Sequence, residues 1–363
     1  MAYYAVSAPA IRRNIEKITR QADGRAVWAV LKCDAYGLGL LPMAAVCRSA
    51  GITRFCVTEP DDALALRENA SAQEEVLLLR PITDADTLRA LLRRNVICTV
   101  ASQQDAIALA SAASAEALRA RAHIAIDTGM GRYGFLPDQI DEILTCYQHL
   151  EHIDFCGMYT HFARAATDTR FARLQTERLL LVRDAVRNAG FEVGHLHAGN
   201  SSALFRCVDC AQDGVRVGSA LLGRTMFRTK LERIGVAKAE LTELRWLPKG
   251  ATFGYDSAYV APHPVRIAIL PVGWFHGFSM TNDVDTFRFR DRLGRLLHSL
   301  KGFFFPRRLT VTVGGQKCPV LGRVGMCHTV IDVTKAAVSG GEEAELAINP
   351  TRLHALPIRW EED

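Results

Sequence analysis

AVWAVLKCDAYG, residues 26–37, places a lysine directly after an apolar run. Six consecutive apolar residues predict a strand that is buried on both faces, because parallel strands covered by helices are almost continuously hydrophobic. A helical pattern follows near residues 40–50, and RFCVT at 54–58 predicts the next strand. A strand, a helix and a second strand in this order indicate a parallel sheet.

The same alternation continues for roughly 220 residues, which is room for seven or eight such units. A long helix is expected from about residue 168 to 189. Further strands are predicted at EVLLLR (75–80), VICTV (96–100), AHIAI (122–126), HIDFCGM (152–158) and EVGHLH (192–197). This number of units predicts a (β/α)8 barrel of the TIM type rather than an open sheet.

The sequence changes character after about Phe227. The runs VRIAILPVGW (265–274), RLTVTVGG (308–315) and TVIDVT (329–334) are separated by Gly, Pro and charged residues, with few long helical patterns. Short β-rich runs of this kind predict a second, mainly β domain at the C-terminal end.

One segment of this second region is both basic and aromatic: FRFRDRLGRLLHSLKGFFFPRR, residues 287–308. We interpret it as an insertion with a short amphipathic helix on the protein surface. An element that faces a partner or touches a membrane is the alternative.

The composition is that of an ordinary globular protein, with 49% hydrophobic and 23% charged residues among 363. A net charge of +5 suits anionic ligands such as phosphates but does not indicate nucleic-acid binding. The N-terminus lacks the pattern of a secretory signal, and no window has the roughly 18 apolar residues of a membrane span. We therefore expect a cytoplasmic protein without a membrane partner.

The ten cysteines do not suggest a disulfide scaffold, because cytosolic thiols stay reduced and the chain is long. Cys207 and Cys210 form one CxxC pair, but no second pair follows at the spacing of a zinc site. The sequence therefore predicts no metal.

Polar residues gather at the ends of the predicted barrel strands, which is where functional residues of this fold lie. The first strand ends at a lysine, and a histidine ends both FCGMYTH and EVGHLH. The candidate residues are Lys32, Asp127, Arg132, His161, His197, Asn200, Ser201, Arg216, Gly218 and Ser219.

Lys32 alone is ambiguous, because a lysine at a barrel rim can extend its charged end into water. Burial of its amine would instead make it nucleophilic toward carbonyl groups. Asn200-Ser201 and Gly218-Ser219 supply hydroxyl and backbone N–H groups suited to a phosphate, and Arg216 could face a ring nitrogen. Together these are the parts needed to hold pyridoxal phosphate.

In these motifs the chain resembles the alanine racemase family. AVLKCDAYGLG resembles the pyridoxal-lysine motif of the family, and FGYDSAYVA resembles the segment that carries its catalytic tyrosine. The other matching segments are DTGMGRYGF, MYTHFA, HAGNSS, GVRVG and GRVGMCHTVIDVT. Seven matches over about 300 residues are far more specific than any single motif.

The resemblance implies a domain organisation and an activity. A barrel that binds pyridoxal phosphate would cover residues 9–226, and residues 1–8 would join residues 227–363 in the β domain. The family forms head-to-tail homodimers whose active sites combine both subunits. Its members interconvert L- and D-alanine by a two-base mechanism and supply D-amino acid for cell-wall precursors.

The resemblance also implies a role for each candidate residue. Lys32 would form the internal aldimine and act as one base, and the partner subunit's Tyr255 would be the opposite base. Arg132 and the backbone at Met326 would bind the substrate. The other cofactor-binding residues would be Tyr36, His161, His197, Asn200, Ser201, Arg216, Gly218, Ser219 and His354.

Four positions depart from the family pattern. Ala125 stands where the family usually has a lysine, often carbamylated, so Arg132 loses its customary anionic partner. Trp274 replaces a tyrosine at the entrance, Cys327 replaces an acidic residue, and His354 replaces a tyrosine near the phosphate. With these changes the resemblance still implies a racemase. Its substrate is either alanine or another small amino acid such as serine.

Three other functions are open alternatives. An amino-acid decarboxylase would use the same barrel, but its acidic and cysteine signature near the C-terminus is not found. A carrier of pyridoxal phosphate is usually a barrel alone, so the β domain counts against it. A relative of the racemases with lost or altered catalysis is the third.

Overall fold

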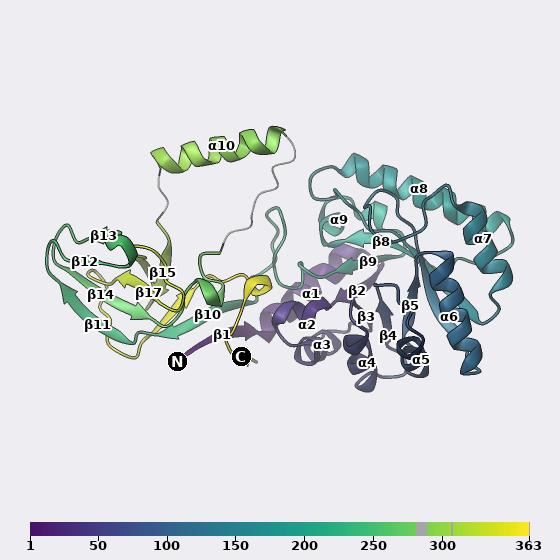
Figure 1. Cartoon of the computed structure of the whole chain (residues 1–363), viewed down its shortest axis with the longest axis horizontal. Helices are drawn as coiled ribbons and strands as arrows, with labels where there is room; N and C mark the ends of the chain where they lie inside the picture. The colour runs from purple at the N-terminus through teal and green to yellow at the C-terminus, as the bar shows by residue number, and fades with distance from the viewer. Residues whose placement is uncertain (281–288, 306–307, 363) are drawn as a thin grey trace. The chain divides into compact units, whose positions relative to one another are not determined.

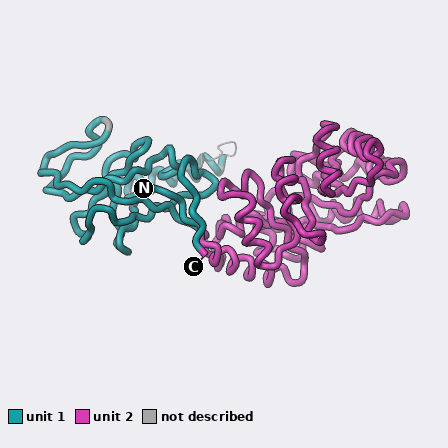
Figure 2. Tube along the Cα trace, turned by 90° about the horizontal axis from the view of Figure 1, so that it is seen from below, with its two compact units in different colours: residues 1–6, 235–361 teal, residues 7–234, 362–363 magenta. Residues whose placement is uncertain are grey.

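The chain folds into two compact units, which Figure 2 shows in different colours. The structure is a computed structural model that describes residues 1–280, 289–305 and 308–362. The barrel unit comprises Ser7–Ile234 and Glu362–Asp363, and the β unit comprises Met1–Val6 and Gly235–Glu361. The β unit is therefore built from two segments that lie far apart in the sequence.

Eight parallel strands close the barrel of the barrel unit. Each strand pairs with the next in the chain, and the last strand closes the barrel by pairing with the first, with Ala26 opposite Gly214. The strands are β2 (Ala26–Val30), β3 (Arg54–Val57), β4 (Glu75–Leu78), β5 (Ile97–Val100), β6 (Ala120–Ala125), β7 (Ile153–Tyr159), β8 (His195–Asn200) and β9 (Gly214–Val217). The prediction of a TIM-type barrel is confirmed.

Helices alternate with these strands and lie outside the barrel (Figure 1). The first of them, α1, is amphipathic: it buries Ile11, Ile15 and Ile18, which lie on one face of the helix. The helices are α1 (Ala8–Ala22), α2 (Lys32–Gly37), α3 (Leu40–Ser49), α4 (Pro60–Glu68), α5 (Ala85–Arg93), α6 (Gln103–Ala115), α7 (Ile140–His149), α8 (Thr169–Asn188) and α9 (Ser201–Arg206). The long helix expected near residues 168–189 is α8.

Among the described residues, the β unit contains three mainly antiparallel sheets. The largest has the strand order β16-β15-β18-β10-β1-β19, so that the N-terminal strand pairs with β10 and Tyr4 lies opposite Ala237. Its strands are β1 (Ala2–Ser7), β10 (Gly235–Glu240), β15 (Thr310–Val313), β16 (Gln316–Pro319), β18 (Glu343–Leu346) and β19 (Ile358–Glu361). The smaller sheets contain β11 (Glu243–Leu247), β14 (Val265–Leu270) and β17 (Thr329–Asp332), and β12 (Thr252–Phe253) with β13 (Tyr259–Val260). The mainly β domain is confirmed.

The basic aromatic segment falls partly outside the described residues, because 287–288 and 306–307 are not described. Between them the structure contains helix α10 (Phe289–Phe304), which agrees with the predicted amphipathic helix. In the described part of the chain, no helix is both long and apolar enough to cross a membrane.

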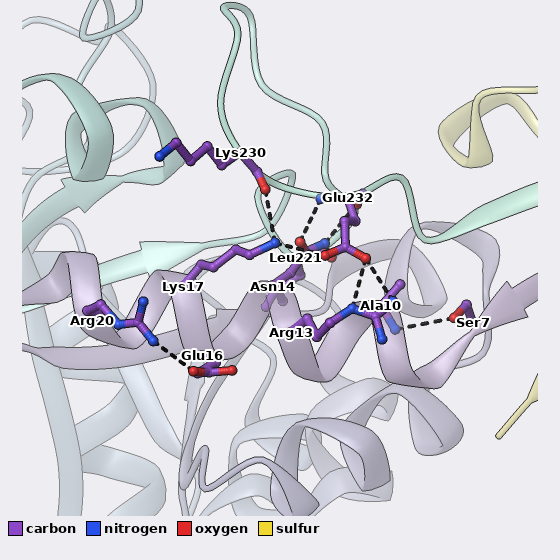
Figure 3. A network of polar contacts seen from close by, with 10 residues as sticks. All are labelled: Ser7, Ala10, Arg13, Asn14, Glu16, Lys17, Arg20, Leu221, Lys230 and Glu232. Carbon is purple, nitrogen blue, oxygen red and sulfur yellow. Dashed lines mark hydrogen bonds and ion pairs between the residues drawn. The ribbon is translucent and has the colours of Figure 1, made fainter. Parts of the chain in front are cut away.

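Asn14 ties α1 to the end of the barrel unit (Figure 3). It is fully buried, and its Nδ2 donates to the carbonyl oxygens of Leu221 (3.2 Å) and Glu232 (2.8 Å). Its Oδ1 accepts a hydrogen bond from the Glu232 N–H at 2.8 Å. Because buried backbone groups need partners, one side chain here serves three groups of a loop without regular structure.

Three histidines and a tryptophan form a polar cluster inside the barrel. His123 Nδ1 lies 2.9 Å from His197 Nε2, and Trp28 Nε1 donates to His195 Nε2 at 3.2 Å. The rings of Trp28 and His197 are stacked with centroids 5.5 Å apart. Burial lowers the pKa of His123 to about 3 and that of His197 well below its ordinary value, so both are neutral in the folded barrel.

Replacement of Asn14 by alanine should lower the free energy of unfolding by about 3 kcal/mol, because three buried backbone groups lose their partner. Urea unfolding followed by circular dichroism measures the change. Arg20→Ala is the matched control on the same helix. The ion pair between Arg20 and Glu16 is exposed to solvent, so removing the Arg20 side chain should change the free energy of unfolding by less than about 0.5 kcal/mol. Equal effects of the two variants would refute the role assigned to Asn14.

Acidification from about pH 7 to about pH 5 should destabilise the barrel unit through its buried histidines. An unfolded histidine takes up a proton near pH 6.5, whereas His123 in the folded barrel does so near pH 3. The unfolded state therefore binds more protons between these values. Each such histidine lowers the free energy of unfolding by about 2 kcal/mol over this interval. Urea unfolding at both pH values measures the loss.

His123→Gln should reduce this pH-dependent loss by about 2 kcal/mol, whatever its effect on stability at neutral pH. His152→Gln is the control, because the His152 side chain is exposed to water in the folded protein. A His123→Gln variant with the pH dependence of the parent would contradict a neutral, buried His123.

Candidate functional site

A cavity of about 320 Å³ lies at the carboxyl ends of the barrel strands. Five of the predicted site residues line it together: Lys32, Asp127, Arg132, His161 and Arg216. Arg80 and Tyr159, which were not predicted, also line it. Four cationic side chains around one cavity favour an anionic ligand.

Lys32 stands at the start of a left-handed turn. It follows β2 and Leu31, and each of the next four residues, Cys33–Tyr36, has φ between 51° and 63°. Residues other than glycine pay roughly 1–2 kcal/mol each for this conformation, and such strain is typical of functional sites. The Asp34 carboxylate holds the turn by accepting a hydrogen bond from the Leu40 N–H at 2.6 Å. Lys32 is exposed, so the expected burial of its amine is not found within the barrel unit.

Tyr36, Ser201 and Gly218 come together beside this turn. Ser201 Oγ accepts hydrogen bonds from the N–H groups of Gly218 (3.1 Å) and Ala220 (3.3 Å). A Cβ at Gly218 would lie 1.8 Å from the Tyr36 hydroxyl oxygen, so this approach requires glycine. Ser219 is exposed on the same segment. The hydroxyl groups of Tyr36 and Ser201 beside the backbone of residues 218–220 are a combination suited to a phosphate.

Asn200 has a structural role at the same place. Its Oδ1 accepts hydrogen bonds from the N–H groups of Ser202 and Ala203, both at 3.0 Å, and so caps α9. Its Nδ2 donates to the carbonyl oxygen of Phe162 at 3.1 Å. Asn200 therefore fixes the residues that carry Ser201, and a direct contact with a cofactor stays a prediction.

Arg216 is a buried cation that only neutral groups contact. Its Nη1 donates to His197 Nδ1 at 2.7 Å, and its Nη2 donates to the carbonyl oxygen of Thr160 and lies 3.5 Å from His161 Nδ1. No carboxylate of the described residues forms an ion pair with it. Because an arginine can only donate, His197 Nδ1 accepts, and the proton of this neutral ring lies on Nε2, toward His123.

His161 is also neutral at physiological pH. Burial, followed by the positive charges of Arg216, Arg132 and Lys32, lowers the pKa of His161 to about 3. The histidines next to Arg216 therefore carry no charge. The positive charge that a ligand meets in this part of the cavity comes from the arginine.

Asp127 shapes the loop that carries Arg132. Its carboxylate accepts hydrogen bonds from the N–H groups of all four residues 129–132, at 2.8–3.0 Å. Partial burial raises the pKa of Asp127, but the four donors outweigh it and lower the pKa. Asp127 is the only acidic side chain of the described residues that lines the cavity, and backbone N–H groups stabilise its negative charge.

Ala125 leaves Arg132 without the anionic partner that is customary in the family. The Ala125 methyl group is buried against Ala101 and Tyr159, at the wall of the cavity. The Arg132 guanidinium lies 6.0 Å from the centre of the Tyr133 ring, at a distance typical of a weak cation–π contact. Arg132 is exposed, so its charge stays available to a ligand.

The other predicted residues, Tyr255, Met326 and His354, belong to the β unit. Tyr255 begins the short helix η2 (Tyr255–Ser257). Met326 and Cys327 line a hollow together with Gly254, the residue before Tyr255. Within this unit, the residue before the predicted base and the predicted substrate-binding backbone therefore line the same hollow.

Three positions of the β unit depart from the family pattern, and they lie near this hollow. The backbone N–H groups of Trp274 and Phe275 donate to the carbonyl oxygens of residues 325–326, at 3.0 and 3.1 Å. The His354 ring contacts the Phe275 ring edge to face, with centroids 4.6 Å apart. Cys327 is exposed beside them. Three of the four departures are thus neighbours.

Arg80 and His123 were not recognised in the sequence. Arg80 ends EVLLLR, so the rule that selected the other strand ends could also have found it. In the structure it pairs with Glu59 at 2.7 Å. His123 lies within AHIAI, and no local signal marks it, because its contact with His197 exists only in the closed barrel.

Comparison with known proteins gives the same result for both halves of the chain. The family model for the N-terminal domain of alanine racemase matches residues 6–226, and that for the C-terminal domain matches residues 235–356. An alanine racemase from Desulforamulus reducens is 32% identical over 338 residues, which are 90% of this chain and 84% of the relative.

Solved structures share the fold. An alanine racemase from Clostridium difficile superposes with a TM-score of 0.85 at 21% identity, covering 100% of this chain and 96% of that chain. One from Bartonella henselae with covalently bound pyridoxal phosphate superposes with a TM-score of 0.80 at 19% identity, covering 99% of both chains. With both domain models matched in order over most of its length, this chain belongs to the alanine racemase family.

Proposed function

We propose that this enzyme interconverts L- and D-alanine with pyridoxal phosphate as its cofactor, and that it thereby supplies D-alanine for cell-wall precursors. The observation that carries the proposal is one cavity at the barrel rim that combines Lys32 with the buried Arg216. The family membership supports the reaction, and the relative from Bartonella henselae, which holds the cofactor covalently, supports the cofactor.

The residues present fit the cofactor. The close approach of the Tyr36 hydroxyl to Gly218 leaves backbone N–H groups and the Ser201 hydroxyl at one place, as a phosphate requires. Lys32 would bind the aldehyde through its amine. His161, His197, Asn200, Ser219 and His354 complete the proposed binding set. Pyridoxal phosphate, when bound, withdraws electron density from the amino-acid Cα and so makes its proton acidic.

Arg216 would determine whether the nitrogen of the cofactor ring carries a proton. It donates to His197 and Thr160 and stays protonated, so a ring nitrogen that it faces would accept a hydrogen bond rather than carry a proton. A neutral ring withdraws fewer electrons, which favours return of the proton to Cα over side reactions. His197 holds the guanidinium in this orientation.

Racemisation requires a proton to leave one face of Cα and to return on the other. Lys32 would hold or move the proton on one face, and the partner subunit's Tyr255 on the opposite face. The proposal therefore includes a head-to-tail homodimer, with a barrel domain of residues 9–226 and a β domain of residues 1–8 and 227–363. Arg132 and the backbone at Met326 would orient the substrate carboxylate.

Lys32→Ala should abolish the conversion of L-alanine to D-alanine, because the variant lacks both the cofactor attachment and one base. Chiral chromatography of the product measures the activity, with L-serine tested beside L-alanine for substrate range. Borohydride treatment of the parent should attach the cofactor to the peptide that contains Lys32, as read by mass spectrometry. Lys230→Ala, at an exposed lysine of the same unit, should keep full activity. A cofactor attached to another lysine would overturn the assignment.

Tyr255→Phe should keep the cofactor and suppress exchange of the α-proton chiefly for one enantiomer, by analogy with the family L-alanine. Removal of one base stops proton transfer on one face only. Exchange of deuterium from solvent into each enantiomer, followed by mass spectrometry, measures this. Tyr259→Phe is the matched control, because that ring packs on Phe253 in the same unit and has no proposed proton to transfer. Equal losses for both enantiomers would contradict the two-base scheme.

A further inference from the structure

Helix α10 presents a continuous apolar face to solvent. Seven large apolar side chains on it are between 45% and 80% exposed. They are Phe289, Leu293, Leu296, Leu297, Leu300, Phe303 and Phe304, here called the apolar face of α10. Single exposed apolar residues are ordinary, but seven on one helix form a patch of the kind that marks a site of interaction.

The periodicity places all seven on one side of the helix. At about 100° per residue they fall within an arc of about 120°, whereas the opposite side carries Gly294, His298 and Gly302. The two glycines weaken an isolated helix by about 1 kcal/mol each relative to alanine. A helix of 16 residues with such a sequence gains most of its stability from burial of its apolar face.

Charge decides what can cover this face. Lys301 borders the arc on one side and Arg292 borders it on the other, with Arg295 farther round the polar side. All three side chains are exposed, and Asp291 is the only acidic residue of the helix. An apolar arc with cations along both edges is typical of helices that lie in the surface of a membrane, because the charged ends reach the lipid phosphates.

A second copy of α10 is a poorer occupant. Two such helices packed face to face would bring their cationic side chains together along both edges of the contact. These charges would repel one another. An anionic lipid surface instead attracts the same cations, by about 1 kcal/mol for each Lys or Arg near it. The helix is about 24 Å long, too short to span a bilayer but long enough to lie along its surface.

We propose that α10 binds the surface of membranes that contain anionic phospholipids, with its apolar face at the boundary of the acyl chains. The proposal revises two expectations from the sequence, an ordinary surface helix and no membrane partner. It does not depend on the proposed racemase activity, because it concerns residues outside the candidate site.

Flotation of the purified full-length holoenzyme with vesicles tests the proposal. One set contains phosphatidylcholine alone, and the other includes about 30 mol% phosphatidylglycerol as the anionic lipid. We expect the bound fraction to be at least about tenfold higher on the anionic vesicles. Raising sodium chloride from about 0.1 M to about 0.5 M should reduce it, because salt screens the attraction.

Two variants separate the apolar and the electrostatic contributions. The double variant L296S/L300S keeps every charge and should lose at least about tenfold in binding, whereas R292Q/R295Q/K301Q should lose the preference for anionic lipid. His298→Ser, on the polar side, is the matched control and should bind like the parent. Circular dichroism and urea unfolding check that each variant is folded.

Three outcomes would overturn the proposal. They are no binding to anionic vesicles, equal binding to neutral ones, and unchanged binding of L296S/L300S. Sedimentation equilibrium without lipid tests the rival occupant. If the parent protein forms a larger assembly than L296S/L300S and does not bind vesicles, the apolar face of α10 binds a second copy of the chain.

Discussion

A protonated arginine in the barrel interior is the constraint on which the candidate site depends. Arg216 is 3% exposed, and its positive charge is stabilised by carbonyl oxygens and imidazole nitrogens instead of carboxylates. Those acceptors must be unprotonated, so the arginine requires His197 to be neutral, and burial acts in the same direction. His197 in turn can donate only from Nε2, toward His123 Nδ1. The positive charge of Arg216 therefore determines the positions of the protons on both histidines.

Around this buried group, the barrel supplies rigid positions and the connecting segments supply reactive groups. The strained turn after Lys32 and the closely packed segment at Gly218 each follow a barrel strand, and small changes of backbone there would displace the functional atoms. Strands β2 and β9, which precede these segments, are paired with each other. The lysine and the proposed phosphate site are therefore fixed by the same pair of strands.

Ala125 shows how a single substitution changes the electrostatics of such a site. In place of the lysine that the resemblance to the family leads us to expect, a buried methyl group leaves Arg132 without an anionic side chain as its partner among the described residues. The Asp127 carboxylate does not replace the missing anion, because it already accepts hydrogen bonds from four backbone N–H groups. A substrate carboxylate would meet a more positive site than the usual family pattern provides.

By itself, the sequence determined the barrel, the β domain and most of the candidate residues, because strand periodicity and the residues at strand ends are local properties of the chain. Only the tertiary structure decided that His123 meets His197, that Lys32 is exposed rather than buried, and that Trp274, Cys327 and His354 lie near one another. The apolar face of α10 could be read from the sequence, but its exposure could not. Burial and contact depend on which distant segments come together, and no local pattern encodes this.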